Sequence, residues 1–221
     1  MHIFLAIFGI ATVVHIVAII LGKEKLRQIS KCLVIPPLLA AYVAGAETQF
    51  LFVIPALILG WIGDVLLLKI NKSIYFKLGL ASFLLGHICY IIVFFDVLGI
   101  FGSGGAAGHL NIPAILIFTP PAIVLGAVVF RLIKPTKEMF FPVIFYMIVL
   151  ETMTLFGFQT FLFNPDTAGL LILAGCICFM VSDTILAYYT FRKLKLSGAV
   201  LIMAYYILAQ AEIVLGLMFL Q

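Results

Sequence analysis

The stretch Trp61-Ile-Gly-Asp-Val-Leu-Leu-Leu68 places an aspartate, Asp64, inside an apolar run that reaches Lys69 before it meets a positive charge. A similar stretch, FMVSDTILA at residues 179–187, recurs late in the chain and holds Asp183 in the matching place. A carboxylate within a membrane span costs about 2.5–3.5 kcal/mol on insertion scales. Two of them in the same local setting are not expected from composition alone. We therefore interpret Asp64 and Asp183 as the paired acids of a membrane-embedded active site.

The composition indicates a membrane protein. Of the 221 residues, 65% are hydrophobic and 10% are charged, whereas a soluble domain has about 45–50% apolar and about 25% charged residues. A chain of this length cannot bury so much apolar surface in its own core, so lipid must cover it. We expect residues 1–221 to form a single polytopic all-α transmembrane domain whose partner is the lipid bilayer. The net charge of +4 does not indicate nucleic-acid binding, because the basic residues form short clusters between apolar spans.

A span needs about 20 apolar residues, and on that basis the sequence predicts eight transmembrane helices. They are expected near 3–22, 30–45, 50–69, 76–95, 112–133, 139–160, 168–191 and 197–220. The second is short in this prediction. All 13 Lys and Arg residues fall in or beside the odd-numbered connections between spans. The positive-inside rule then places those connections in the cytosol and both termini outside.

An internal repeat is suggested by the spacing around the two aspartates. Asp64 is followed 23 residues later by His87, and Asp183 is followed 23 residues later by Tyr206. This predicts two four-helix halves in parallel repeat, related by an axis along the membrane normal. Chance similarity between apolar helices is the alternative.

The depth of each polar group follows from its distance along the helix to the nearest cytosolic charge. At about 1.5 Å per residue, Asp64 lies about 8 Å deep, Asp183 about 14 Å and His87 about 15 Å. These groups therefore share the cytosolic half of the membrane, and we expect the site to open toward the cytosol or the inner leaflet. The alternative is that both aspartates only hold neighbouring helices together.

Other polar residues in the spans are candidates for supporting or substrate-binding roles. His87 and Tyr90 share a helical face, and so do Tyr206 and Gln210 of the last span. These pairs can equally be hydrogen bonds between helices. Lys31, at the predicted start of the second helix, either extends its side chain to the cytosolic membrane interface or meets a lipid phosphate. The supporting candidates are Lys31, His87, Tyr90, Glu151, Ser182, Tyr206 and Gln210.

The sequence predicts no metal site and no cofactor. Only His15 and His87 lie within spans, and no HxxxH or His-rich pattern is present. The sequence contains no GxSxG elbow, so acyl transfer by a catalytic triad is not indicated. Gly-rich phosphate loops are also absent from the sequence.

Several motifs together resemble the YhhN family, which includes membrane lysoplasmalogenases of bacteria and vertebrates. They are GDVLLL at 63–68, Gly-Leu at 79–80, GHICY at 86–90, FMVSDTILA at 179–187, and Tyr205-Tyr206 with Gln210. The resemblance covers nearly the whole chain. It matches Lys31, Asp64, Asp183 and the pair His87 and Tyr90 to the family pattern, whereas Glu151 is not placed by it.

The resemblance implies hydrolysis of the vinyl ether bond of lysoplasmalogens, which yields a fatty aldehyde and glycerophosphoethanolamine or glycerophosphocholine. The residue chemistry fits this reaction independently. An enol ether is cleaved by proton transfer to carbon followed by capture of the cation by water. The reaction needs one protonated acid and one carboxylate, and a buried carboxyl pair can supply both. We expect Asp183 to be the acid, Asp64 the base, and Lys31 a ligand of the lysophospholipid phosphate.

Other functions fit the same residues. Intramembrane acids and a parallel repeat also suit a proton-coupled transporter of lipids or small molecules. A metal-dependent membrane amidase resembling alkaline ceramidase, and an assembly factor whose aspartates only join helices, are further alternatives. A multi-pass protein this compact favours a bacterial inner membrane. Headgroup preference and oligomeric state are left open.

Overall fold

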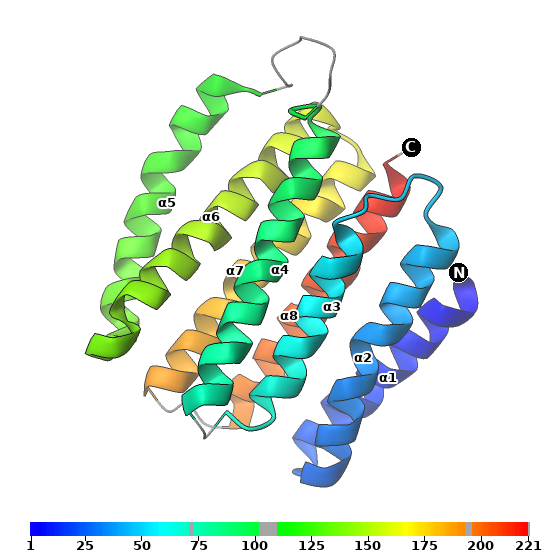
Figure 1. The fold of residues 1–221 in the computed structure, drawn as a ribbon, viewed down its shortest axis with the longest axis vertical. Coiled ribbons are helices and arrows are strands. Elements are labelled where there is room, and N and C mark those ends of the chain that lie inside the picture. Colours follow the sequence, from blue (N-terminus) through cyan, green and yellow to red (C-terminus); the bar gives the residue numbers. More distant parts are fainter. Residues whose placement is uncertain (71–72, 102–109, 193–195, 221) are drawn as a thin grey trace.

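The chain folds into a bundle of long helices (Figure 1). The computed structural model describes residues 1–70, 73–101, 110–192 and 196–220. The α-helices within this part are α1 (His2–Ile20), α2 (Glu24–Gly45), α3 (Val53–Leu67), α4 (Ser73–Val97), α5 (Ile112–Ile133), α6 (Phe140–Phe163), α7 (Thr167–Arg192) and α8 (Leu196–Phe219). A short 3-10 helix (Lys137–Met139) precedes α6. The prediction of an all-α protein with eight helices is confirmed for these residues.

Two helix lengths differ from the prediction. The second helix is not short, because it begins at Glu24 rather than near residue 30 and spans 22 residues. The first turn of a helix can project from the apolar layer and carry charged side chains there. The charges after residue 22 therefore mark the edge of the apolar layer, and α2 already begins among them, at Glu24. The third helix is shorter than predicted, with 15 residues. In the described part of the chain, seven helices are long and apolar enough to cross a membrane, and α3 is apolar but shorter.

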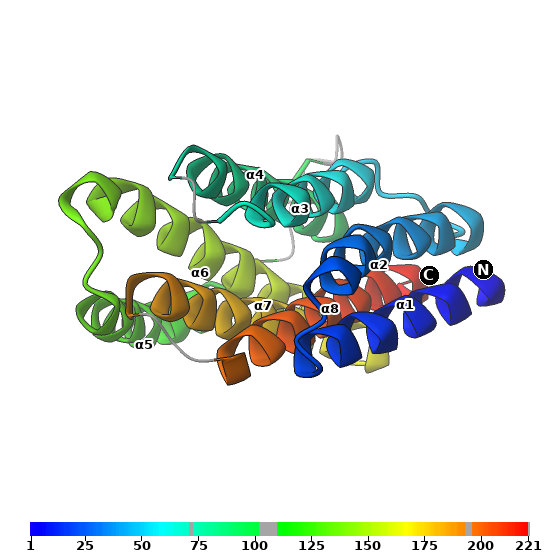
Figure 2. The same ribbon diagram turned by 90° about the horizontal axis from the view of Figure 1, so that it is seen from below.

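Seven of the helices described form a closed ring. The pairs in contact run α1–α2, α2–α3, α3–α4, α4–α6, α6–α7, α7–α8 and α8–α1. α5 stands outside this ring and contacts α6 and α7 (Figures 1 and 2). Of the 22 residues of α5, two are buried, Gly126 and Ile133. The two aspartates, Lys31 and His87 all come from helices of the ring, whereas α5 is an outer helix with one weakly packed face.

Glycines allow the two last helices to pack with their backbones close together. A Cβ added at Gly175 of α7 would lie 2.7 Å from Ile213 Cγ1 and 2.9 Å from the Ala209 carbonyl oxygen of α8. A Cβ added at Gly216 of α8 would lie 2.8 Å from the Ala168 carbonyl oxygen. Small residues at helix contacts are typical of membrane bundles, where close backbone approach replaces the hydrophobic effect as the driving force.

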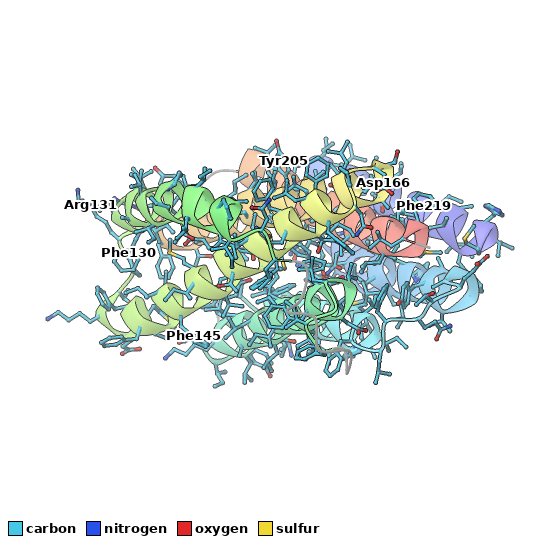
Figure 3. All side chains as sticks on the ribbon, turned by 90° about the horizontal axis from the view of Figure 1, so that it is seen from above. Phe130, Arg131, Phe145, Asp166, Tyr205 and Phe219 are labelled. Atoms are coloured by element: carbon cyan, nitrogen blue, oxygen red, sulfur yellow. The ribbon has the colours of Figure 1, made fainter. Side chains whose placement is uncertain are left out.

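The outer surface is apolar, as expected of a multi-pass membrane protein. Phe145 of α6 is 54% exposed, and Figure 3 shows it on the outside of the bundle. The two ends of the chain lie near each other (Figure 2), since Met1 and Met218 both pack where a Cβ on Gly45 would be. The side of the membrane on which the ends lie stays a prediction, and so does the parallel repeat.

Candidate active site

A polar cavity lies inside the ring, at the end of the bundle where α1 joins α2. Its volume is about 260 Å³. Both aspartates line it, so the structure brings the two acids into one site. The charged and polar residues of its wall are Glu24, Arg27, Lys31, Asp64, Ser182, Asp183, Tyr189 and Tyr206. We call this space the polar cavity.

Asp64 is paired with a buried lysine. The Lys31 ammonium nitrogen lies 3.3 Å from Asp64 Oδ1, and the two side chains are 10% and 3% exposed. The other carboxylate oxygen, Oδ2, makes no hydrogen bond within the described part of the chain, although the Tyr206 hydroxyl lies near the carboxylate. The lysine lies within α2 rather than at its start, and its buried side chain does not extend to the interface. It pairs with the acid and lines the polar cavity, and its contact with a lipid phosphate stays a prediction.

Asp183 has a different set of partners. The Tyr146 hydroxyl donates a hydrogen bond of 2.5 Å to Asp183 Oδ2, and His87 Nε2 lies 3.8 Å from the same oxygen. His87 is held edge-on between aromatic rings, 4.9 Å from Phe179 and 5.5 Å from Tyr146 between centroids. No Lys or Arg nitrogen of the described residues lies within ion-pair distance of Asp183. The two acids therefore differ in kind, since one has a permanent cation beside it and the other has a phenol and an imidazole.

Tyr146 was not predicted from the sequence. It is one of several aromatic residues in the sixth helix, and nothing in its neighbourhood resembles the stretches around the aspartates. One signal was available, because Tyr146 lies nine residues after Lys137 and Asp183 lies nine residues before Arg192. In helices that start at the same membrane face, equal spacing from a basic residue means equal depth.

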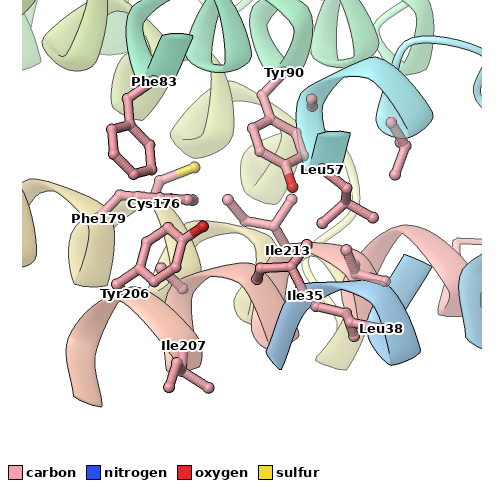
Figure 4. Packing of buried hydrophobic residues seen from close by; sticks show 14 of the residues in the cluster. Ile35, Leu38, Leu57, Phe83, Tyr90, Cys176, Phe179, Tyr206, Ile207 and Ile213 are labelled. Carbon is pink, nitrogen blue, oxygen red and sulfur yellow. The ribbon is translucent and has the colours of Figure 1, made fainter. Parts of the chain in front are cut away.

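A chain of hydrogen bonds links three of the predicted residues, Tyr90, Gln210 and Tyr206. The Tyr90 hydroxyl donates to Gln210 Oε1 at 2.5 Å, and Gln210 Nε2 donates to the Tyr206 hydroxyl at 3.5 Å. Figure 4 shows the rings of Tyr90 and Tyr206 extending toward each other from α4 and α8. Ser182 donates to the Ile202 carbonyl oxygen at 3.0 Å, which ties α7 to α8 beside the site. The chain runs from Tyr90 to the hydroxyl next to Asp64.

A second cavity meets the polar cavity at Asp183. Its volume is about 280 Å³, and it lies between α4, α5, α6 and α7. Its wall is apolar except for Tyr146, Glu151, Asp183 and Thr184. Asp183 and Leu186 line both spaces. We call this space the proximal apolar cavity. Glu151 belongs to its far end and does not line the polar cavity, so the structure separates this residue from the two aspartates.

A comparison with known families now identifies the chain. The model of the YhhN family matches residues 26–217. The chain belongs to the YhhN family. Neither a curated protein nor a solved structure matches it. Membership fits a membrane protein of the lysoplasmalogenase type.

One charged residue at the mouth of the site in this YhhN family member was not predicted. Arg27 lines the polar cavity, and Glu24, one helical turn earlier, accepts hydrogen bonds from its Nε at 2.9 Å and its Nη2 at 2.5 Å. The Arg27 side chain is 29% exposed. Arg27 was missed because the second helix was predicted to begin near residue 30, which put this residue in a loop. A guanidinium here can bind a phosphate through two parallel hydrogen bonds.

The acidic, histidine and cysteine side chains of this YhhN family member are dispersed over the described helices. Within the described residues, no group of three or more His, Cys, Asp or Glu side chains lies close enough to hold a metal ion. The second intramembrane histidine, His15, hydrogen-bonds through Nδ1 to Ser30 Oγ at 2.9 Å. This bond joins α1 to α2 and lies apart from the aspartates.

Proposed function

We propose that this protein hydrolyses the vinyl ether bond of lysoplasmalogens, with Asp183 as general acid and Asp64 as general base. The observation that carries the proposal is the position of Asp183 in the wall of both the polar cavity and the proximal apolar cavity. In a lysoplasmalogen, the vinyl ether bond lies between the glycerophosphate headgroup and a single alkyl chain. A lipid with its headgroup in one cavity and its chain in the other would present this bond to Asp183.

The headgroup end of the substrate meets positive charge at the entrance of the polar cavity. Arg27 lines that entrance, and its present partner Glu24 is 60% exposed. Such an exposed ion pair is weak, about 0–1 kcal/mol. A phosphate can therefore replace Glu24 at the guanidinium. We assign the phosphate to Arg27 and not to Lys31, because the Lys31 ammonium pairs with Asp64.

The two acids have the environments that the reaction needs. Lys31 neutralises a carboxylate at Asp64. Asp183 has no such cation beside it, and an unpaired charge in a buried place is costly. We therefore assign the proton to Asp183 in the resting enzyme.

The first step transfers this proton from Asp183 to the chain carbon of the double bond that does not carry oxygen. The double-bond electrons form the new C–H bond, and the other carbon becomes an oxocarbenium ion next to the ether oxygen. Both carboxylates stabilise the positive charge at this stage. Water then attacks the oxocarbenium carbon while Asp64 accepts the proton of the water, which gives a hemiacetal.

The second step breaks the C–O bond and restores both acids. Asp183 accepts the hydroxyl proton of the hemiacetal, and the carbonyl of the fatty aldehyde forms. Asp64 donates its proton to the departing glycerol oxygen. One water is consumed, and each aspartate returns to its starting state.

The supporting residues position these two acids. Tyr146 and His87 fix the orientation of the Asp183 carboxyl group. Tyr206, held by Gln210, lies near Asp64. Tyr90 in turn orients Gln210. We infer from the basic connections that the polar cavity faces the cytosol, and we assign the protein to a bacterial inner membrane because the chain is so compact.

The test is aldehyde release by purified protein in detergent micelles. We expect Asp64→Asn and Asp183→Asn to lose at least about a hundredfold in kcat, the usual contribution of general acid–base catalysis. Glu138→Gln is the matched control, because Glu138 is a surface carboxylate that is 79% exposed, and it should keep full activity. A lysolipid with a saturated ether at the same position should not be cleaved, since it cannot form the oxocarbenium ion by protonation.

Three outcomes would argue against the proposal. Full activity in either aspartate variant removes that residue from the mechanism. Cleavage of the saturated ether excludes protonation of a double bond. Absence of aldehyde, together with lipid or proton movement in sealed vesicles, would favour a transporter instead.

A further inference from the structure

A third cavity extends the site away from Asp183. Its volume is about 620 Å³, and α5, α6 and α7 line it. Its wall is apolar except for Asn111 and Glu151. Leu125, Glu151 and Met180 line both this space and the proximal apolar cavity. We call it the distal apolar cavity. The two apolar cavities therefore adjoin, and together they have the size of a small-molecule site, about 300–1,000 Å³.

The junction between them is formed by one carboxyl group and one glycine. The Glu151 carboxyl group lies where a Cβ on Gly126 of α5 would be. Any other residue at position 126 would press on this group or displace it. Gly126 is also one of only two buried positions among the described residues of α5. The contact between Gly126 and Glu151 is therefore a main packing contact of α5 with the ring. It also forms the constriction between the two apolar cavities, which we call the neck.

The length of the two cavities fits one lipid chain. Tyr146 and Leu162 line opposite ends of the pair, and they are 16 residues apart on α6. At about 1.5 Å per residue this is about 24 Å. One leaflet of the hydrocarbon layer is about 15 Å thick, half of a bilayer core of about 30 Å. A single chain that starts at Asp183 can therefore extend past the neck and still lie within the protein.

We propose that the proximal and distal apolar cavities form one alkyl-chain site, and that the neck at Gly126 and Glu151 determines which chain lengths are bound. This rests on the proposed function, because the chain starts at the bond next to Asp183. A short chain ends before the neck. A long chain passes it and gains contacts in the distal cavity, lined by Ile117, Phe118 and Phe158.

The first experiment compares short-chain and long-chain lysoplasmalogens in wild type and Gly126→Phe. The larger side chain should block the neck, so kcat/KM for the long chain should fall at least tenfold relative to the short chain. Val124→Phe is the matched control, since Val124 is on the same helix, is 63% exposed and lines neither cavity. It should leave the ratio unchanged. Ala122→Trp, within the distal cavity, should act like Gly126→Phe and replaces it if that variant fails to fold.

A second experiment is independent of turnover. A long-chain lysophospholipid with a photoreactive group at the end of its chain should label α5 and α6 residues of the distal cavity in wild type and in Val124→Phe. Labelling there should be lost in Gly126→Phe or Ala122→Trp. This result would stand even if no aldehyde were released, in which case the reaction is wrong and the chain site is right. Unchanged chain-length ratios, or labelling of other helices only, would overturn the chain site.

Discussion

Replacement of the buried lysine gives the sharpest test of the site as described. At the 3.3 Å that separates Lys31 Nζ from Asp64 Oδ1, the attraction between unit charges is about 5 kcal/mol at an effective dielectric constant of about 20. Lys31→Met keeps the volume of the side chain and removes the charge. Asp64 would then be a buried carboxylate without a partner, and breaking a buried pair in this way costs about 3–5 kcal/mol. We expect the free energy of unfolding to fall by that amount.

The chain offers a matched control at the same distance. Lys77 Nζ also lies 3.3 Å from a carboxylate oxygen, that of Glu138, but these side chains are 45% and 79% exposed. Water screens this pair, so Lys77→Met should cost less than about 1 kcal/mol. Thermal unfolding in detergent micelles measures both variants. The contrast isolates burial, because pair type and distance are the same.

A double variant separates the charge from the packing. Lys31→Met with Asp64→Asn contains no buried charge at this place, so it should regain most of the stability that Lys31→Met loses. It should not regain aldehyde release, because Asn cannot accept a proton from water. The reasoning would be refuted if Lys31→Met were as stable as Lys77→Met, or if the double variant were no more stable than Lys31→Met.

Three further predictions concern the entrance, the acid and the fold. Arg27→Gln should raise KM for the phospholipid substrate about tenfold in a steady-state assay while kcat changes little, and a change confined to kcat would contradict the phosphate role. Tyr146→Phe removes a hydrogen bond that stabilises the Asp183 carboxylate formed as the proton leaves, worth about 1.5–3 kcal/mol, so kcat should fall about 10- to 100-fold, and wild-type kcat would argue against a positioning role. Gly175→Ala should lower the unfolding free energy by about 1–3 kcal/mol through overpacking against α8, whereas Gly9→Ala, with nothing within 4 Å of the added Cβ, should be neutral or stabilising in a thermal melt.

The sequence predicted that the two aspartates share one site, but it did not predict their partners. Rise per residue is fixed in a helix, so spacing from the basic clusters predicts that Asp64 and Asp183 lie in the same half of the membrane. Which side chain faces which depends on the order of helices around the ring. That order is a property of tertiary packing and leaves no trace in the spacing. Lys31 shows this, because its pairing with Asp64 needs α2 and α3 to be neighbours with these two faces together.

The boundary of α2 shows a second limit. Charged residues after an apolar span predict a loop, yet Glu24 and Arg27 lie in the first turn of a helix. An ion pair at i,i+3 stabilises such a turn, so the charges were compatible with helix from the start. The outer position of α5 was equally hidden, since its apolar composition does not differ from that of the ring helices. Both cavities that meet at Glu151 depend on that position.

Under the proposed function, the shared wall at Asp183 would also separate the two products. The two products differ in their affinity for water, and each would already be in the compartment that suits it. The glycerol fragment would leave toward the aqueous mouth, and the aldehyde would remain among hydrocarbon walls next to the bilayer. A reactive carbonyl would thus be delivered to the membrane without passing the amines of the cytosol.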